Sequence, residues 1–172
     1  DTYDAINVGG TTGITLASGA IIDIDVTKLS HMLLDELQSR LTISDQNIVI
    51  HNGTISALDA KLLDSTTTGK VTASIDRTTL VDSLKTLTGT NNEFTIVISS
   101  EDATGSTASE LTAIDNATTV AVDASAINQI SGTYDDIKTL YGSGGITGLG
   151  DENITITTCL LYTSDAADES RG

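Results

Sequence analysis

Short segments in which apolar and polar residues alternate recur along this chain at nearly constant intervals. They are IIDIDV from Ile21, NIVI from Asn47, KVTASI from Lys70, FTIVIS from Phe94, VAVDAS from Val120 and NITIT from Asn153. Successive segments are about 23 to 26 residues apart, except for a longer last interval. Because a period of two residues is typical of strands that bury one face, the chain is expected to contain regularly spaced β-strands.

The alternation also predicts which side of each strand faces the core. The residues expected to point inward are Ile22, Ile24, Val26, Ile48, Ile50, Val71, Ala73, Ile75, Phe94, Ile96, Ile98, Val120, Val122 and Ala124. The opposite side carries mostly polar groups, including Asp23, Asp25, His51 and Asp123. One apolar and one polar face indicate that each strand has the core on one side only.

Between the strands, the apolar residues are spaced for amphipathic helices. Leucines four residues apart are expected to form the buried stripes: Leu29, Leu33, Leu37 and Leu41, then Leu58 and Leu62, then Leu80 and Leu84. A hydroxyl residue followed three positions later by an acid predicts where four helices begin. These pairs are Ser56 with Asp59, Thr79 with Asp82, Thr107 with Glu110, and Thr133 with Asp136.

Strands that are joined through helices in connections of this length pair in parallel by a right-handed crossover. We therefore predict an α/β fold, a repetitive right-handed solenoid of short parallel strands alternating with helices, with about 24 residues per coil. The units are expected at residues 18–51, 52–99 and 100–158. A doubly wound sheet is the alternative, but its strands are buried on both faces and read as continuous apolar runs.

A second, longer repeat joins pairs of these units. TTTGKVTAS from Thr66 returns as ATTVAVDAS from Ala117, and NIVI corresponds to FTIVIS and to NITIT. The text from Leu111 to Thr157 resembles units that recur in giant repetitive proteins of marine bacteria and cyanobacteria, and a more diverged unit covers Leu62 to Ser99. That resemblance implies a surface or secreted parent protein, and therefore an extracellular or cell-surface location.

The last residues follow a different composition. CLLYTSDAADE, residues 159–169, is similar to one translated frame of a sequencing-library adapter. We interpret residues 159–172 as an adapter-derived tail and leave them out of the fold prediction, with a genuine C-terminal strand as the alternative. Both ends of the sequence are accordingly expected to be truncated.

The chain carries 24 acidic against 8 basic residues, a formal net charge of −16. Phosphate binding depends on clustered lysine and arginine, so this balance argues against a nucleic-acid partner. No apolar run approaches the roughly 18 residues that a membrane-spanning helix needs, so insertion into a membrane is not expected. An acidic surface attracts cations, which makes calcium the candidate ion.

Five acidic residues are candidate calcium ligands: Asp23, Asp25 and Asp123 on the polar strand faces, and Asp151 and Glu152 at the end of the glycine-rich segment YGSGGITGLGDEN. That segment resembles the calcium-binding nonapeptide repeats of secreted bacterial toxins, but it departs from their Gly-Gly-x-Gly-x-Asp order. Ordinary solvation of the carboxylates and a simple glycine-rich connection are the alternatives.

These observations favour a structural or adhesive repeat segment of a large exported bacterial protein. Its expected partners are neighbouring repeats of the parent chain and cell-surface or matrix components, and we expect no enzymatic activity and no required cofactor. His31 and His51, the only histidines, form no recognisable catalytic or zinc-binding arrangement. A calcium- or carbohydrate-binding module is the alternative, and a glycan-active enzyme, which needs paired carboxylates, comes third.

Overall fold

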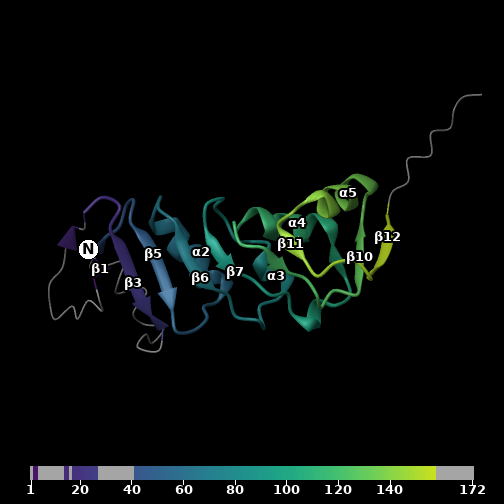
Figure 1. Cartoon of the computed structure of the whole chain (residues 1–172), viewed down its shortest axis with the longest axis horizontal. Helices are drawn as coiled ribbons and strands as arrows, with labels where there is room; N and C mark the ends of the chain where they lie inside the picture. The colour runs from purple at the N-terminus through teal and green to yellow at the C-terminus, as the bar shows by residue number, and fades with distance from the viewer. Residues whose placement is uncertain (1, 4–13, 16, 27–40, 158–172) are drawn as a thin grey trace, which may run out of the picture.

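The computed structural model describes residues 2–3, 14–15, 17–26 and 41–157. These residues form a mixed α/β structure that is elongated along one axis, with the longer strands lying across that axis (Figure 1). The ribbon runs from purple β1 at one end to yellow β12 at the other, so segments close in sequence are also close in space. The fold is therefore built mainly from contacts between neighbouring segments.

Every strand pair among the described residues is parallel, as predicted. A five-stranded sheet has the order β1-β3-β5-β6-β7, formed by β1 (Thr2–Tyr3), β3 (Ile21–Asp25), β5 (Asn47–His51), β6 (Val71–Ser74) and β7 (Glu93–Thr95). Beyond β7, a single bridge between Val97 and Asp123 leads to β9 (Val122–Asp123), which pairs with β11 (Ile146–Thr147). These strands form the first ladder.

A second ladder is formed by strands that follow those of the first ladder along the chain. It contains β8 (Ser106–Thr107), β10 (Gln129–Gly132) and β12 (Asn153–Ile156), in the order β12-β10-β8. A bridge between Ile55 and Ile75 makes a parallel pairing of the same kind earlier in the chain. A further short pair joins β2 (Ile14–Thr15) to β4 (Leu41–Thr42).

The six alternating segments all contain strands, but the last of them, β12, does not lie in the same ladder as the other five. Val122 pairs with Ile146, whereas Ile154 pairs with Ile130. The correspondence of NITIT to NIVI and FTIVIS is therefore wrong, because β12 belongs to the second ladder. The long last interval disappears once β11, inside the glycine-rich segment, is counted as the next strand of the first ladder.

The predicted inward residues are confirmed. All of them are buried except Val26 and Val120, which are half-buried. Ile48 and Phe94, from neighbouring parts of the first ladder, are fully inaccessible at 0% exposure. A continuous apolar core therefore runs along the structure beneath the strands.

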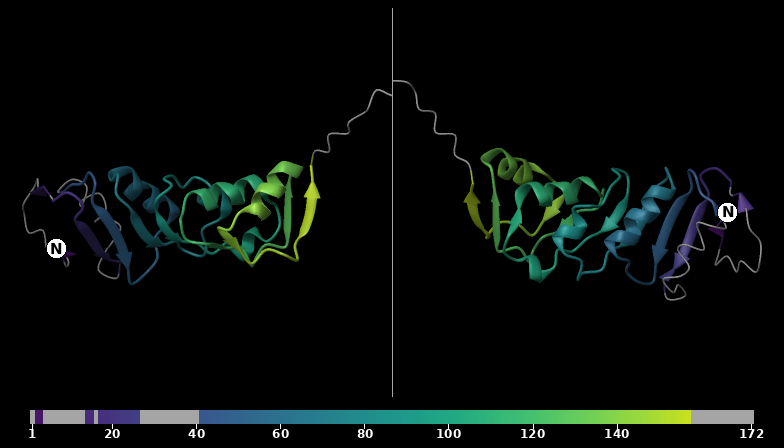
Figure 2. Two further views of the ribbon diagram at one scale, coloured as in Figure 1. Left: turned by 45° about the horizontal axis from the view of Figure 1, so that its top comes forward. Right: turned by 180° about the vertical axis from the view of Figure 1, so that it is seen from behind.

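Within the described residues, four helices connect the strands: α2 (Ala57–Thr66), α3 (Val81–Leu84), α4 (Ala108–Asn116) and α5 (Tyr134–Gly142), with a 3₁₀ turn η2 (Ser100–Asp102) before β8. Consecutive helices contact one another, and α4 and α5 lie side by side in the green part of the ribbon in both views of Figure 2. Three of these helices, α2, α4 and α5, begin after a serine or threonine, residue types that cap helices well.

Three of the four predicted helix starts are confirmed. The hydroxyls of Ser56, Thr107 and Thr133 each accept a hydrogen bond from the backbone N–H three residues later, and the last two form complete capping boxes. The fourth, at Thr79 and Asp82, is wrong, because α3 begins after Leu80 without a side-chain cap of its own.

The predicted leucine stripes are only partly correct. Leu58 is 75% exposed, and α2 instead buries Ala57, Ala60 and Leu63. Because Ser56 fixes the start of this helix, residues three apart from Ala57 face the strands, and Leu58 points away. Leu80 lies before α3 and is exposed, whereas Leu84 is buried. Leu41 belongs to β4, and Leu29, Leu33 and Leu37 lie outside the described residues.

Candidate functional site

The two acids of β3 do not form an open cation site. Asp23 Oδ1 lies 2.8 Å from His51 Nε2 on the neighbouring strand β5. This oxygen is buried, and the imidazole of His51 lies directly beside it. Asp25 lies opposite His51 in the strand register.

Asp123 is held in the turn that follows β9. Its Oδ1 accepts a hydrogen bond from the backbone N–H of Ser125 at 3.0 Å. Hydrogen bonds from the Ser125 hydroxyl and N–H, with a smaller contribution from the positive charge of Arg77, hold the pKa of the Asp123 carboxyl below its usual value. This carboxylate therefore stabilises its own turn.

Asp151 and Glu152 lie in the loop between β11 and β12. Asp151 is exposed, and Glu152 Oε2 accepts a hydrogen bond from Gly150 N at 2.7 Å. The other oxygen, Glu152 Oε1, is buried and accepts no hydrogen bond within the described residues. Gly148, at φ +82°, lies so close to Ser125 that a Cβ there would come within 2.7 Å of the Ser125 amide nitrogen. The glycine-rich loop is thus packed against the Asp123 turn.

The structure does not bring the five candidate ligands together. Three strands, β5, β6 and β7, separate Asp23 and Asp25 from β9, so these acids lie on the order of 19 Å from Asp123 at the usual spacing of strands. Over residues 17–26 and 41–157, no group of three or more His, Cys, Asp and Glu side chains could hold a metal ion. Ligand oxygens lie about 2.3 to 2.6 Å from a calcium ion, so acids this far apart cannot share one ion.

A polar corner at Thr67, which the sequence analysis did not find, joins the end of α2 to the first ladder. The buried Thr67 hydroxyl donates to the carbonyl of Gln46 at 2.6 Å and accepts from the N–H of Gly69 at 2.9 Å. The next residue, Thr68, donates its backbone N–H to the carbonyl of Ser44 at 2.7 Å. The corner therefore ties this turn to the preceding strand region.

The same corner recurs after α4. The buried Thr118 hydroxyl donates to the carbonyl of Phe94 at 2.8 Å and accepts from the N–H groups of Phe94 at 2.9 Å and Val120 at 3.2 Å. Thr119 then donates its N–H to the carbonyl of Asn92 at 2.8 Å, as Thr68 does to Ser44. Thr67 and Thr118 hold equivalent places in TTTGKVTAS and ATTVAVDAS. Three hydrogen bonds therefore recur in both copies of the longer sequence repeat, and the one from the Phe94 N–H is additional at Thr118.

Acids near the ends of α2 and α4 form a second set of recurring hydrogen bonds to the following segment. Asp64 accepts hydrogen bonds from the Thr88 hydroxyl and from Asn92 Nδ2, each at 2.8 Å. Asp115, at the equivalent place in α4, accepts from the Ser143 hydroxyl. A Cβ on Gly145 would come within 1.8 Å of Asp115 Oδ1, so only glycine fits beside this carboxylate.

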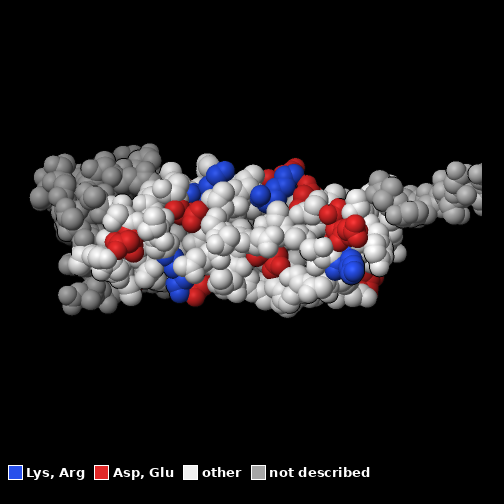
Figure 3. Space-filling model, turned by 90° about the horizontal axis from the view of Figure 1, so that it is seen from above, with Lys and Arg blue, Asp and Glu red and all other residues white. Residues whose placement is uncertain are grey.

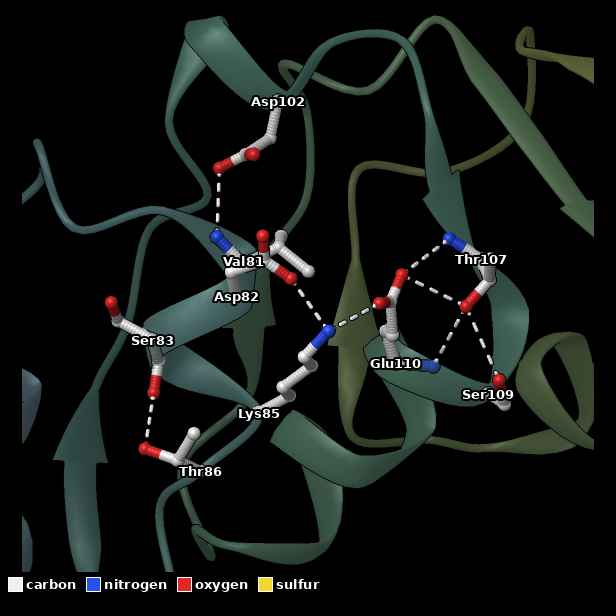
Figure 4. Close-up of polar contacts among 9 residues, drawn as sticks. All are labelled: Val81, Asp82, Ser83, Lys85, Thr86, Asp102, Thr107, Ser109 and Glu110. Atoms are coloured by element: carbon white, nitrogen blue, oxygen red, sulfur yellow. Dashed lines mark hydrogen bonds and ion pairs between the residues drawn. The ribbon is translucent and has the colours of Figure 1, made fainter.

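A third set of contacts joins α3 to the segment after it (Figure 4). Lys85 Nζ lies 2.6 Å from Asp82 Oδ1 and 2.7 Å from Glu110 Oε1 at the start of α4. The hydrogen bonds that Lys85 donates to these two carboxylates raise the pKa of its ammonium group, and Lys85 in turn lowers the pKa of Glu110. Asp102 Oδ2 accepts from Val81 N at 2.9 Å and so supplies the helix cap that α3 lacks.

Charged side chains on the strand side also connect neighbouring segments. Lys70 Nζ lies 2.7 Å from Glu93 Oε1, across the pair β6 and β7, and this contact lowers the pKa of Glu93. Figure 3, which views the molecule from the top of Figure 1, shows lysine and arginine beside acidic residues in several small groups. The polar groups described here therefore connect neighbouring segments instead of converging on one site.

No protein-family model matches the chain, and no curated protein or solved structure is significantly similar to it. Within the described ranges, the helices are too short and too polar for any of them to cross a lipid bilayer.

Proposed function

We propose that this chain is a structural repeat segment, a right-handed solenoid whose stacked coils set distance and present surface in a large exported protein. The observation that carries the proposal is the recurrence of the Thr67 corner at Thr118, with the same donors and acceptors. Repetition of a buried polar contact at equivalent places favours successive copies of one building unit over unrelated loops.

The strand register gives further support. Parallel partners lie 19 to 27 residues apart along the chain, and the separation is 24 residues in β8, β10 and β12 and in β9 and β11. Consecutive helices contact each other, which favours one helical layer over the two layers of a doubly wound sheet. We assign one strand from each ladder and one helix to each coil.

The mechanism of such a segment is stacking. A single coil cannot bury both its inward strand residues and its helix face, so each coil is stabilised by its neighbours. Ala108 illustrates this, because it is 0% exposed and a Cβ on Gly132 of the next coil would lie 3.2 Å from its own Cβ. Added coils then extend the molecule without changing its cross-section.

Duplication of coils tests the proposal. A second copy of residues 106–153, inserted after Asn153, adds two register steps to each ladder. The enlarged chain is expected to unfold at a higher urea concentration and with a larger m value, because more coils have two neighbours and more surface is buried. An enlarged chain with the original m value would contain an unfolded insertion and would contradict the stacking of equivalent coils.

Cation binding at Asp151 and Glu152 is a second candidate function, favoured by the unpartnered buried atom Glu152 Oε1. A cation there would supply the missing partner and would stabilise the folded chain according to its affinity. Calcium is expected to raise the melting temperature of the natural chain relative to excess chelator, and Glu152→Gln is expected to remove that rise. Equal melting curves in calcium and in chelator would eliminate this candidate.

A further inference from the structure

The turn after β5 contains the pair Asn52-Gly53, and both residues are exposed. Asn52 has a φ of +60°, the only positive φ of a non-glycine residue in the part of the chain that the structure describes. Asparagine is one of the few residue types that adopt this left-handed conformation at low cost. The turn therefore favours asparagine or glycine at position 52.

Packing against the neighbouring strand determines the next residue. A Cβ on Gly53 would lie 3.2 Å from the Cβ of Val26 and 3.3 Å from its Cγ1, closer than an ordinary van der Waals contact. Val26 directly follows β3, so a side chain at position 53 would press against the adjoining segment. The fold thus favours an asparagine directly before a glycine, a pair that occurs once in the sequence.

The polar groups of this pair are not held by hydrogen bonds within the described residues. Neither the carboxamide of Asn52 nor the N–H of Gly53 takes part in one there. By contrast, Asp76 and Asp123, beside the turns after β6 and β9, each accept a hydrogen bond from the N–H two residues later. The Asn52 side chain is therefore free to rotate toward the backbone of the following residue.

We propose that Asn52 is a site of spontaneous modification, at which the folded chain converts its own asparagine to isoaspartate. The backbone nitrogen of Gly53 loses its proton and attacks Cγ of Asn52, the bond from Cγ to the side-chain nitrogen breaks, and that nitrogen leaves as ammonia. The product is a five-membered succinimide ring. A solvent water then opens the ring. Cleavage between the Gly53 nitrogen and the Asn52 backbone carbonyl carbon gives isoaspartate, and cleavage at Cγ gives aspartate.

Glycine promotes this attack because it has no Cβ to crowd the nitrogen and it leaves the backbone free to rotate. Asn47, in the same strand region, has the opposite surroundings. It is half-buried in β5, it precedes the β-branched Ile48, and its Oδ1 accepts a hydrogen bond from Lys70 N at 2.8 Å. The reaction is therefore expected at Asn52 and not at Asn47.

Isoaspartate at position 52 would change the connection between two paired segments. The backbone then runs through the former side chain, which adds one carbon atom between β5 and Ile55. Ile55 donates its N–H to the Ser74 carbonyl at 3.0 Å and accepts from Asp76 N at 2.9 Å. Because the pairing register depends on the length of chain between paired residues, the added atom is expected to weaken these hydrogen bonds. The modified chain should therefore be less stable.

Peptide mapping of the full chain, after incubation at physiological temperature and neutral pH, tests the proposal. Trypsin cleaves after Arg40 and Lys61 and releases residues 41–61 as one peptide, so Asn47 and Asn52 are compared in the same molecule. Modification of Asn52 is expected at least about tenfold faster than that of Asn47. Equal rates at the two residues, or aspartate at position 52 without isoaspartate, would overturn the proposal.

The same incubation in guanidinium chloride separates the effect of the fold from that of the sequence. The rate at Asn52 in the folded chain is expected to lie within about tenfold of the rate in the unfolded chain, because no hydrogen bond restrains the pair. A folded chain that keeps Asn52 intact while the unfolded chain is modified would show that the turn protects this residue, and would contradict the proposal.

Two variants test the chemistry and its consequence. Gly53→Ala keeps the asparagine but places a Cβ beside the attacking nitrogen, and should slow the modification at least about tenfold. Asn52→Gly keeps the left-handed conformation and removes the carboxamide. After equal incubation, the natural chain is expected to unfold at a lower urea concentration than before, whereas Asn52→Gly should keep its midpoint. A modified natural chain with an unchanged midpoint would refute the predicted effect on the Ile55 pairing.

Discussion

The Thr118 corner allows a direct test of how neighbouring segments are joined. Thr118→Val keeps the shape of the side chain but removes a hydroxyl that is 8% exposed at the residue level. Its loss leaves the N–H of Phe94, a residue with 0% exposure, without its acceptor at 2.9 Å, and removes the hydrogen bond to the Phe94 carbonyl. An unsatisfied buried donor costs about 1 to 3 kcal/mol, and the lost hydrogen bond adds about 1 kcal/mol.

We therefore expect Thr118→Val to lower the free energy of unfolding by about 2 to 4 kcal/mol. The half-buried N–H of Val120 also loses its acceptor, but water can reach that residue and reduce the cost. Urea denaturation followed by circular dichroism measures the change, provided that the m value stays the same. A loss of this size is a large fraction of the stability of a single domain.

The neighbouring residue supplies the matched control. Thr119 is exposed, and its hydroxyl donates to the Asn92 carbonyl at 3.1 Å. The Thr119 backbone N–H donates to the same carbonyl, so Thr119→Val leaves that acceptor satisfied. We expect this change to alter the free energy of unfolding by less than about 0.5 kcal/mol. Equal effects at Thr118 and Thr119 would refute the reasoning, because the difference depends only on which buried group loses its partner.

Three further predictions follow from the core, the glycine-rich loop and the α3–α4 ion pairs. Ile96→Asp, at a residue with 2% exposure, is expected to cost several kcal/mol and to lower the melting temperature markedly, because it buries an unpaired charge. Gly145→Ala is expected to destabilise the chain because its Cβ meets Asp115, and Asp115→Ala should recover part of that loss in a double-mutant cycle measured in urea. Because the pKa of Glu110 is lowered in the folded chain, its carboxylate stabilises the fold above pH 4.5, the ordinary pKa of the group. That stabilisation is lost as the pH falls through the folded-state pKa. Urea denaturation at several pH values below 5 should therefore show a loss of stability that is smaller in Glu110→Gln than in the unaltered chain. An equal loss in both chains would contradict the role given to Glu110.

The strands were the part of the fold that the sequence predicted best. Residues such as Ile48 and Phe94 alternate with polar neighbours, and a period of two leaves only one choice of inward face. The short strand at Ile146 was missed because it lies among glycines and has no alternating pattern. Its register with Val122 comes from the neighbouring strand, which local sequence does not reveal.

The helices were harder to orient from sequence. In α2, the predicted stripe of Leu58 and Leu62 is not the buried face, which contains Ala57, Ala60 and Leu63 instead. The cap at Ser56 fixes where the helix begins and therefore which residues face the strands, and side-chain hydrophobicity alone does not carry that information. Asp102 likewise caps α3 from a later segment, so the helix start at Val81 has no local capping signal.

The candidate site showed the limit of reasoning from single residues. Asp23 and Asp123 both lie on the polar side of a strand, as predicted, but the order of strands keeps them apart. Thr67 and Thr118 were visible as a repeated pattern, but their role became clear only with the backbone groups that they contact. Repetition was therefore the sequence signal that pointed to the contacts between segments.

Small-angle X-ray scattering of the duplicated chain tests the central claim most directly. The measurement compares the chain carrying the second copy of residues 106–153 with the unduplicated chain. Stacking of two further coils is expected to lengthen the particle by about 10 Å, at about 4.8 Å per strand, while the cross-sectional radius of gyration stays the same. An increase in the cross-section without this lengthening would show that the added residues do not continue the stack and would contradict the account.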